Sequence, residues 1–300
     1  MITIIIPTFN RAYALEKVLE SYYGEEFINE IIIVDDAGDD NSREIVEVFS
    51  KKYPNILTKY IRHSEKKGAS GCRKTGYEIA LSEYVLFGED DVCLASNYTR
   101  VLLQKIMEDE TIGLVSGRII YMEYQESIAN AKKRFGDGFT SEKPFNKISF
   151  GCNPNAKFTG DIQVPVTHAL FLTRKSLLQK FGYDPYYSKG NGYREETDFQ
   201  IKAFLNGCKI VITNDTRCYH LSRLEIHKGG QRINRFWRLY WSVYYTEYFY
   251  DQYFEQIKQK LDIRYGKRTA LIFFFVFQVF NLFINPLIKV PKLLIKRLFV

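Results

Sequence analysis

Short apolar runs alternate with longer amphipathic segments over the first hundred residues of the chain. The apolar runs are rich in Ile and Val and cover residues 2–6, 30–34, 57–61 and 84–87. The segments between them, residues 12–23, 42–53 and 69–82, carry apolar residues at helical spacing. This alternation predicts repeated strand–helix–strand units around a largely parallel sheet, which is an α/β fold.

Polar residues follow each of the four apolar runs. The four runs lead into Pro7-Thr8-Phe9-Asn10-Arg11, Asp35-Asp36, Arg62-His63 and Glu89-Asp90-Asp91. Because ligands of open α/β sheets bind beyond the carboxyl ends of the strands, we expect these residues to form one site. Their mixture of acids, cations and hydrogen-bonding groups predicts a ligand that is anionic and forms hydrogen bonds.

The chain from residue 121 to residue 220 shows a less regular pattern. Residues 121–164 are rich in Gly, Lys and Phe with weak periodicity, which predicts long connections that line or cover the site. A regular apolar pattern returns at residues 166–172. Beyond them the pattern predicts a short helix at 174–181, a helix that follows the Gly-rich stretch 190–192 and ends at Asn206, and strands at 209–213 and 216–219.

The composition changes again after residue 230. Residues 236–254 are crowded with Trp, Tyr and Phe, and residues 270–288 form a nineteen-residue apolar run with three polar members. This length is close to the roughly 20 residues that span a bilayer. Lys and Arg flank both sides of the run, so the positive-inside rule gives no orientation. We expect a segment that lies in the membrane interface or turns back at Asn285-Pro286, with a helix packed on the protein as the alternative.

Charge and cysteine content narrow the cellular setting. The net charge is +7, and Asp262 is the only acidic residue from Gln256 onward, so the tail holds much of the positive excess. That placement favours a membrane surface over nucleic acid. The five cysteines have neither the spacing of a zinc site nor that of a disulfide framework, and the apolar start stops at Pro7 without a basic leader. We therefore expect reduced thiols and a cytosolic location.

Two acidic clusters are candidates for chemistry. Glu89-Asp90-Asp91 offers the oxygen ligands that Mg²⁺ prefers, although a solvated acidic turn explains the triplet equally well. A second cluster, Glu195-Glu196 with Asp198, lies at a predicted helix start. Its carboxylates either supply a general base or cap the helix. His220 either completes the metal site or is structural.

Five ordered segments together resemble glycosyltransferase family 2. They are residues 4–11, residues 33–36 with Asp39 or Asp40, Gly68 with Arg73 and Gly76, residues 89–91, and residues 195–198. The resemblance implies a GT-A fold, in which helices flank a Rossmann-like mixed sheet. It covers about residues 1–225, as a nucleotide-binding half (1–118) and an acceptor half (119–225). Residues 226–300 would then be an aromatic and basic helical tail that associates with membranes.

The same resemblance implies a role for each motif residue. A UDP-, GDP- or dTDP-sugar donor would lie on Pro7, Thr8, Asn10, Arg11, Asp35, Asp36, Gly68, Arg73 and Asp90. Mg²⁺ or Mn²⁺ on the donor diphosphate would be held by Asp91, with Glu89 and His220. The catalytic base would be Glu196, with Glu195 and Asp198 beside it. The chain departs from the family where Glu89 replaces a usual Asp and where Glu-Glu replaces a frequent Glu-Asp.

The sequence thus predicts a metal-dependent, inverting glycosyltransferase that adds a sugar to a lipid-linked or surface-glycan acceptor. We expect it at the cytoplasmic face of the cell membrane, as a peripheral, monotopic or single-span protein. The alternative is a non-catalytic, membrane-associated assembly protein that binds nucleotide sugars. A nucleotidyltransferase is disfavoured, because Pro-Thr-Phe-Asn-Arg stands where such enzymes have a Gly-rich, Arg-Lys loop.

Overall fold

A computed structural model of the chain describes residues 1–136, 143–153, 156–230 and 233–286. Its main sheet has the strand order β3-β2-β1-β4-β10-β6-β11-β5, and β9 also pairs with β11. The strands are β1 (Ile2–Thr8), β2 (Ile28–Asp35), β3 (Leu57–Arg62), β4 (Tyr84–Phe87), β5 (Val92–Leu94), β6 (Ile112–Tyr121), β9 (Asp161–Gln163), β10 (Leu172–Arg174) and β11 (Lys209–His220). A separate pair is formed by β7 (Phe145–Asn146) and β8 (Gly151–Cys152).

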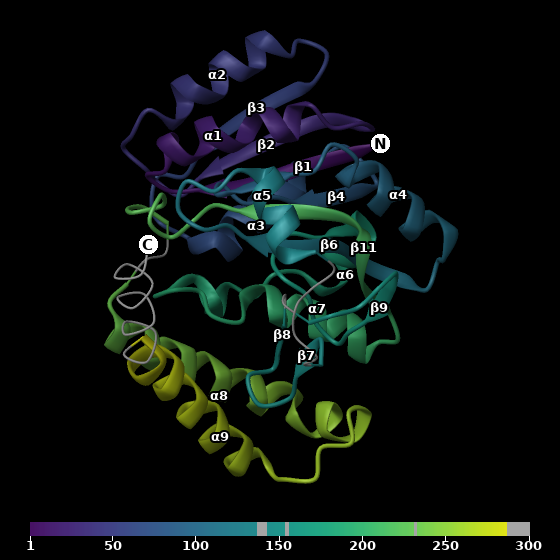
Figure 1. The fold of residues 1–300 in the computed structure, drawn as a ribbon, viewed down its shortest axis with the longest axis vertical. Helices are drawn as coiled ribbons and strands as arrows, with labels where there is room; N and C mark the ends of the chain where they lie inside the picture. The colour runs from purple at the N-terminus through teal and green to yellow at the C-terminus, as the bar shows by residue number, and fades with distance from the viewer. Residues whose placement is uncertain (137–142, 154–155, 231–232, 287–300) are drawn as a thin grey trace.

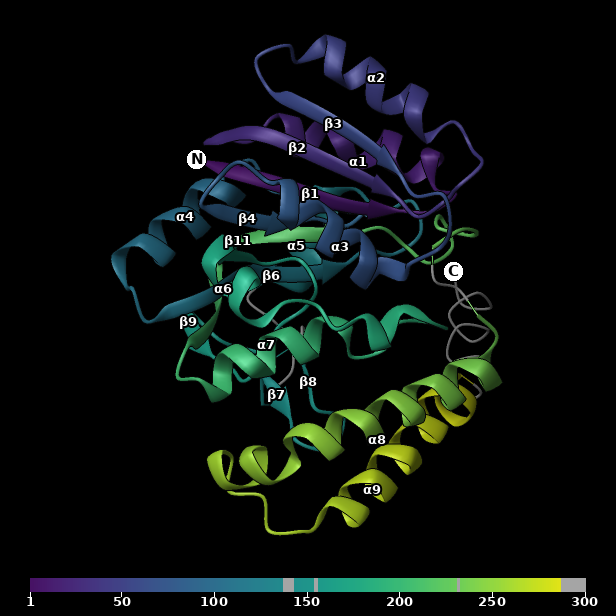
Figure 2. The same ribbon diagram turned by 180° about the vertical axis from the view of Figure 1, so that it is seen from behind.

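Helices cover both faces of this sheet (Figures 1 and 2). The α-helices of the described residues are α1 (Ala12–Tyr23), α2 (Ser42–Lys52), α3 (Gly68–Ile79), α4 (Tyr98–Glu108), α5 (Ile128–Phe135), α6 (Lys175–Phe181), α7 (Glu195–Leu205), α8 (Arg235–Lys260) and α9 (Lys267–Val279). A 3-10 turn, η1 (Pro185–Ser188), precedes α7, and a π-helical segment, η2 (Phe280–Ile284), continues α9. Both views show α7 between the sheet and the pair formed by α8 and α9.

The apolar runs form strands because both sheet faces are buried. Along β1, Ile4 and Ile6 enter a core with α1 and α4, whereas Ile5 enters a second core that contains residues of α3, α7 and α8. A strand buried on both faces has no polar side, so its sequence is continuously apolar. The predicted helical spacing is confirmed in α1, where Leu15 and Tyr22 are fully buried.

The central strands end together, which places the polar residues at one edge. β1 runs parallel to β2 and β4, with Thr8 opposite Asp35 and Ile5 opposite Phe87. The main-chain ladder continues for one more bond on each side, from Asp36 N to Thr8 O (2.9 Å) and from Gly88 N to Ile5 O (2.8 Å). The residues that follow β1, β2 and β4 therefore face a common crevice, as the sequence predicts.

Two expectations for the second half of the chain need correction. Residues 121–164 hold α5, β7, β8 and β9 between their connections. The two strands expected at 209–213 and 216–219 are one strand, β11, with a register shift between Thr213 and Arg217. The irregular stretch stays attached to its neighbours because Asn214 accepts a hydrogen bond from Arg118 Nε (2.8 Å) and Thr216 donates one to Asn97 (2.9 Å). The strand can therefore continue to His220 beside β6.

The C-terminal helical tail is present. Helix α8 begins after Asn234, whose side chain accepts a hydrogen bond from Trp237 N (3.0 Å) and caps the helix. Its inner side adds Phe249, Phe254 and Ile257 to the second core. Helix α8 thus shares a core with α3 and α7, and the domain boundary at residue 225 stays a prediction.

Candidate active site

A cleft of about 1230 Å³ lies at the carboxyl ends of β1, β2 and β4. The start of α7 and residues 149–152 also line it. Twelve of the residues predicted for the site are brought together there: Pro7, Thr8, Arg11, Asp36, Gly68, Arg73, Glu89, Asp90, Asp91, Glu195, Glu196 and His220. Three predicted residues, Asn10, Asp35 and Asp198, are not among those that line it.

Asn10 and Asp35 instead shape the loops beside the cleft. Asp35 accepts hydrogen bonds from Gly38 N (2.7 Å) and from the Tyr60 hydroxyl, so both of its oxygens are used within the protein. The Asn10 side chain accepts a bond from Asp39 N (2.8 Å). These contacts connect the ends of β1 and β2.

Asp36 lines the cleft as part of a buried corner. Its carboxylate accepts hydrogen bonds from Lys67 N (2.7 Å) and Gly68 N (3.0 Å), which fixes the start of α3. His63 and Cys72 lie beside it, and the ligand atoms of these three residues lie within 4.8 Å of one another. Both oxygens of Asp36 are already used by these main-chain hydrogen bonds, and His63 Nε2 lies 2.9 Å from the Thr75 hydroxyl. We therefore interpret this group as a hydrogen-bonded corner and not as a metal site.

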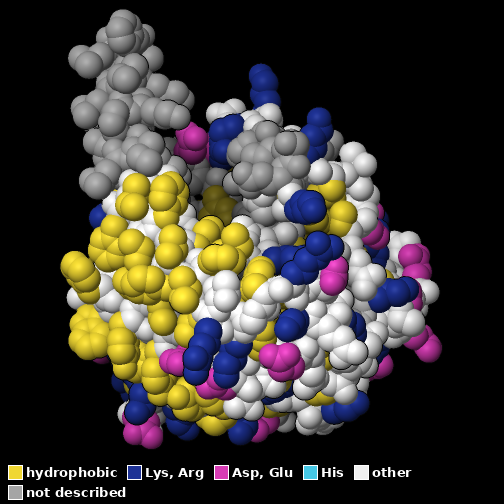
Figure 3. Space-filling model, turned by 90° about the horizontal axis from the view of Figure 1, so that it is seen from below, with side chains coloured by type: hydrophobic (Ala, Val, Ile, Leu, Met, Phe, Trp, Pro, Cys, Tyr) yellow, Lys and Arg dark blue, Asp and Glu magenta, His cyan; other side chains and the backbone are white. Residues whose placement is uncertain are grey.

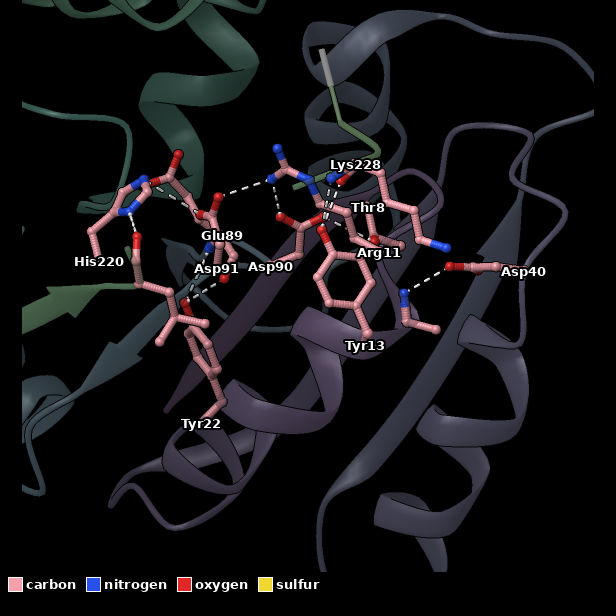
Figure 4. Close-up of polar contacts among 12 residues, drawn as sticks. Thr8, Arg11, Tyr13, Tyr22, Asp40, Glu89, Asp90, Asp91, His220 and Lys228 are labelled. Atoms are coloured by element: carbon pink, nitrogen blue, oxygen red, sulfur yellow. Dashed lines mark hydrogen bonds and ion pairs between the residues drawn. The ribbon is translucent and has the colours of Figure 1, made fainter. Parts of the chain in front are cut away.

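The acidic triplet after β4 is bridged by Arg11 (Figure 4). Arg11 Nη1 lies 2.7 Å from Asp90 Oδ1 and 2.9 Å from Asp91 Oδ2. The Thr8 hydroxyl donates to the other oxygen of Asp90 (3.0 Å). The single positive charge of Arg11 thus offsets only part of the negative charge of the two carboxylates, so the cluster keeps a net negative charge.

His220, at the end of β11, lies beside the same cluster. Its Nδ1 is 2.7 Å from the carbonyl oxygen of Leu221, which favours the tautomer that carries the proton on Nδ1. The lone pair of Nε2 then lies on the side of Asp91, whose Oδ1 is 3.7 Å away. Asp91 and His220 are therefore placed as an oxygen and a nitrogen ligand for one cation.

The pKa values of two acids in the triplet are raised, so their ionised forms lack compensating positive charge. Burial raises the pKa of Glu89 to about 7, and the charge of Asp91 adds to this effect. Burial also raises the pKa of Asp90 to about 6, although Arg11 opposes the shift. A divalent cation would favour the ionised form of both carboxylates. The residues present therefore fit a hard divalent metal.

The second acidic cluster begins α7. Glu195 is buried and pairs with the equally buried guanidinium of Arg73. Burial raises the pKa of Glu195 to about 7, and Arg73 opposes the shift. Glu196 lines the cleft half-buried, and no hydrogen bond or ion pair from its carboxylate is found in the described parts of the chain. Glu196 is thus the carboxylate of this pair that is open to a ligand.

Asp198 has a structural position, contrary to the prediction that places it in the catalytic group. It is fully buried, accepts a hydrogen bond from the Tyr253 hydroxyl of α8 (2.8 Å), and pairs with Lys202 (2.6 Å). Its side chain lies on the face of α7 that packs against α8, as the contact with Tyr253 shows, and it does not line the cleft. Asp198 joins two helices.

Several cleft residues were missed by the sequence analysis. Arg223 and Arg238 line the cleft, and Arg238 falls in the segment that the sequence analysis assigned to the membrane tail. His168 lines it too, but its ring bonds Gly117 O (2.9 Å) and Leu170 N (3.2 Å), and burial lowers its pKa to about 4. Arg194 also lines the cleft and lies directly before the Glu pair.

Comparison with known proteins identifies the family. The model of glycosyl transferase family 2 matches residues 3–180. The chain belongs to this family. A curated relative, the GalNAc(5)-diNAcBac-PP-undecaprenol beta-1,3-glucosyltransferase of Campylobacter jejuni, is 29% identical over 211 residues, which is 68% of this chain and 63% of the relative. Glycosyltransferase GlyG of Streptococcus pneumoniae is 26% identical over 218 residues, 72% of this chain and 68% of the relative.

Solved glycosyltransferase structures share the fold of this family 2 glycosyltransferase. S. aureus TarS in complex with UDP-GlcNAc superposes with a TM-score of 0.57 at 17% identity, over 93% of this chain and 72% of that one. A mannosyltransferase from Pyrobaculum calidifontis in complex with GDP-Man and Mn²⁺ gives 0.56 at 16% identity, over 95% and 70%. The expected GT-A fold is confirmed.

The buried acids predict an unusual dependence of stability on pH. The folded-state pKa of Glu89 lies near 7, above its ordinary value of 4.5, so between these values the folded chain binds more protons than the unfolded chain. The free energy of unfolding should therefore fall as the pH rises from 5 to 8, by about 1–3 kcal/mol. Ion-paired acids with a lowered pKa, such as Asp109, titrate below this window.

Urea denaturation at pH 5 and pH 8, with a chelator present, measures this effect. Glu89→Gln should be more stable than the parent chain at pH 8 and should show a flatter dependence on pH. A parent chain whose stability rises from pH 5 to pH 8 contradicts the prediction.

Proposed function

We propose that this glycosyltransferase moves a sugar from a nucleotide-diphosphate donor to a lipid-linked or surface-glycan acceptor, with a divalent metal and with inversion at the anomeric carbon. The observation that carries the proposal is that two separate clusters of carboxylates line one cleft. Asp91, beside His220, is suited to a cation, and Glu196 has an open carboxylate suited to proton transfer.

The donor is proposed to lie along the ends of β1 and β2. Pro7, Thr8, Asp36, Gly68 and Arg73 line this part of the cleft. Asn10 and Asp35 would act indirectly, by fixing the loops. Related folds are solved with UDP-GlcNAc and with GDP-Man, so UDP-, GDP- and dTDP-sugars are all candidate donors.

Asp91 and His220, with Glu89, are the residues that would hold Mg²⁺ or Mn²⁺. The cation would supply positive charge to the diphosphate as it leaves. Arg11 already balances part of the negative charge of Asp90 and Asp91, and it lies where a diphosphate would add further negative charge.

Glu196 is proposed as the general base. It would take the proton from the attacking hydroxyl of the acceptor, which then displaces the nucleotide from the opposite side of the anomeric carbon and inverts its configuration. Glu195 cannot take this role easily, because its carboxylate is already paired with Arg73. Glu195 would instead hold Arg73 in the cleft wall.

The two glutamates can be separated by experiment. Donor hydrolysis to water, with Mn²⁺ and with UDP-glucose, UDP-N-acetylglucosamine, dTDP-glucose or GDP-mannose, reports the chemical step without an acceptor. Glu196→Gln should lower kcat by about 10²–10⁴-fold while donor binding is retained, because the amide cannot accept the proton. Glu195→Gln is the matched control and should lose less than about tenfold, since an amide oxygen still accepts from Arg73. The reverse order of the two variants would contradict the base assignment.

The acceptor and location are proposed from relatives and from the tail. The Campylobacter jejuni relative is named for GalNAc(5)-diNAcBac-PP-undecaprenol, and another relative is a minor teichoic acid biosynthesis protein of Bacillus subtilis. We therefore infer a role in polysaccharide or glycolipid biosynthesis at the cytoplasmic membrane face. The halves 1–118 and 119–225 and the tail 226–300 remain our proposed division of the chain.

The tail offers an apolar face to a membrane. Among the described residues, Lys267–Ile284 is the helical stretch that is long and apolar enough to cross a bilayer by length and composition alone, and 17% of it is buried. Figure 3 shows hydrophobic side chains gathered on one half of the underside of the molecule. The exposed apolar residues of α9 and η2 are Ile272, Phe273, Phe275, Val276, Phe280 and Ile284. Because the inner side of α9 is packed and the outer side is bare, we propose that it lies in the membrane interface.

Vesicle co-sedimentation tests the apolar face. The double variant Ile272→Glu/Val276→Glu places two negative charges on the apolar face, at exposed positions one helical turn apart, so the fold should be kept. Its binding to phosphatidylglycerol vesicles should fall by about tenfold or more. Val48→Glu/Leu81→Glu changes two equally exposed apolar residues elsewhere and should bind normally. Equal binding by the two double variants would contradict the proposed surface.

A further inference from the structure

Arg194 has an uncommon backbone conformation next to the proposed base. Its φ is +81°, in the left-handed region, which is strained for a residue other than glycine. The residue is also 4% exposed, so a full positive charge is buried immediately before Glu195. Strain and a buried charge at one position persist only where the surroundings hold the residue firmly.

The guanidinium is held by the cleft wall and by α8. Arg194 Nη1 donates to Phe150 O (2.6 Å), Nη2 donates to Ser149 O (2.7 Å), and Nε donates to the Thr246 hydroxyl (3.2 Å). Ser149 and Phe150 line the cleft, and Thr246 belongs to α8. Within the described residues its hydrogen bonds go to neutral oxygens, so they fix its place without neutralising it.

Four aromatic rings surround the same group. The guanidinium carbon lies 5.0–5.9 Å from the ring centroids of Tyr193, Phe150, Phe249 and Phe274. The negative faces of aromatic rings attract a cation in a dry environment. Phe249 comes from α8 and Phe274 from α9, so the cage joins the tail helices to the turn that begins α7.

Helix α9 also touches that turn directly. The side chain of Gln278 donates a hydrogen bond to the Tyr193 hydroxyl (2.9 Å), and the ring of Tyr193 lies against Phe274, with 5.8 Å between centroids. Phe274 and Gln278 are buried, whereas their neighbours on the outer face of α9 are exposed. The two residues before Glu195 are therefore held by the inner side of the helix whose outer side we assign to the membrane.

We propose that Arg194 is a positioning residue that holds Glu196 at its place in the cleft, and that the contacts of α8 and α9 with Tyr193 and Arg194 are part of this support. The inference rests on the proposed function of Glu196. Proton transfer needs reacting atoms within about 3 Å, so a turn that shifts by a fraction of an ångström slows the reaction. The donor is proposed to lie against the strand ends, and only Arg73, through its pair with Glu195, links it to this turn, so donor binding should depend on the turn much less than proton transfer does.

Arg194→Gly is the decisive variant. Glycine adopts the left-handed conformation at little cost, so the backbone of the turn is kept while the guanidinium is removed. In the donor-hydrolysis assay with Mn²⁺, kcat should fall by about 10–100-fold and the KM for the donor should stay within about twofold. Methylguanidinium at tens of millimolar should restore part of kcat, which a purely structural defect would not allow.

Two further variants keep the test independent of folding defects. Gln278→Met removes only the bond from α9 and should lower kcat by about three- to tenfold at unchanged donor KM. Arg174→Lys is the matched control, because Arg174 also donates to two main-chain carbonyls, those of Ile112 and Ile106, but lies outside the cleft. It should lower the melting temperature without a selective loss of kcat.

Glu196→Gln, assayed in parallel, separates this inference from the proposed function. If Glu196→Gln is inactive and Arg194→Gly and Gln278→Met keep the parent kcat, the positioning role is overturned and the base assignment stands. If Glu196→Gln is as active as the parent chain, the proposed function and this inference both fail. Parallel losses of kcat, donor affinity and melting temperature in Arg194→Gly, without rescue, would also overturn the positioning role.

Discussion

The fold gathers negative charge at a place where burial makes that charge costly. Glu89, Asp90 and Asp91 follow β4, Glu195 and Glu196 begin α7, and all of these carboxylates line the same cleft. An ionised carboxylate that is buried without a cation nearby destabilises the folded state by an amount on the order of several kcal/mol. Arg11 pairs with the first cluster and Arg73 with the second. We propose that the negative charge left unbalanced by these two cations serves to bind a metal ion and to accept a proton from the acceptor.

The two clusters of carboxylates come from different layers of the structure and meet in the cleft. The first is set by the sheet, since the register of β1 with β2 and β4 brings three strand ends to the same edge. The second is set by α7, which packs under the sheet through Phe199 and rests on α8 through Asp198 and Tyr253. The tail helices α8 and α9 thus have two faces with different surroundings. One contacts the turn before Glu195, and the other is bare and apolar.

The part of the site that depends on strand ends could be predicted from the sequence. The period of apolar residues locates each strand end within a residue or two, and in a parallel sheet these ends share an edge. Asn10, Asp35 and Asp198 could not be placed, because their positions are decided by individual partners such as Tyr60 and, for Asp198, Tyr253, which lies 55 residues along the chain. The left-handed turn at Arg194 was equally hidden, since arginine has no preference for that conformation and the contacts that hold it come from distant residues such as Phe150 and Phe274.

The central claim is that the acidic cluster binds a divalent cation together with a nucleotide sugar. Thermal unfolding of the full chain with UDP-, GDP- and dTDP-sugars, each with Mn²⁺ and with a chelator, tests it most directly. A ligand at 100 times its Kd stabilises the folded state by about 2.7 kcal/mol, so binding is readily seen. The account predicts an increase in melting temperature for the sugars of one nucleotide base, lost with the chelator and in Asp91→Asn. An equal increase with Mn²⁺ and with chelator, or no increase with any donor, would contradict it.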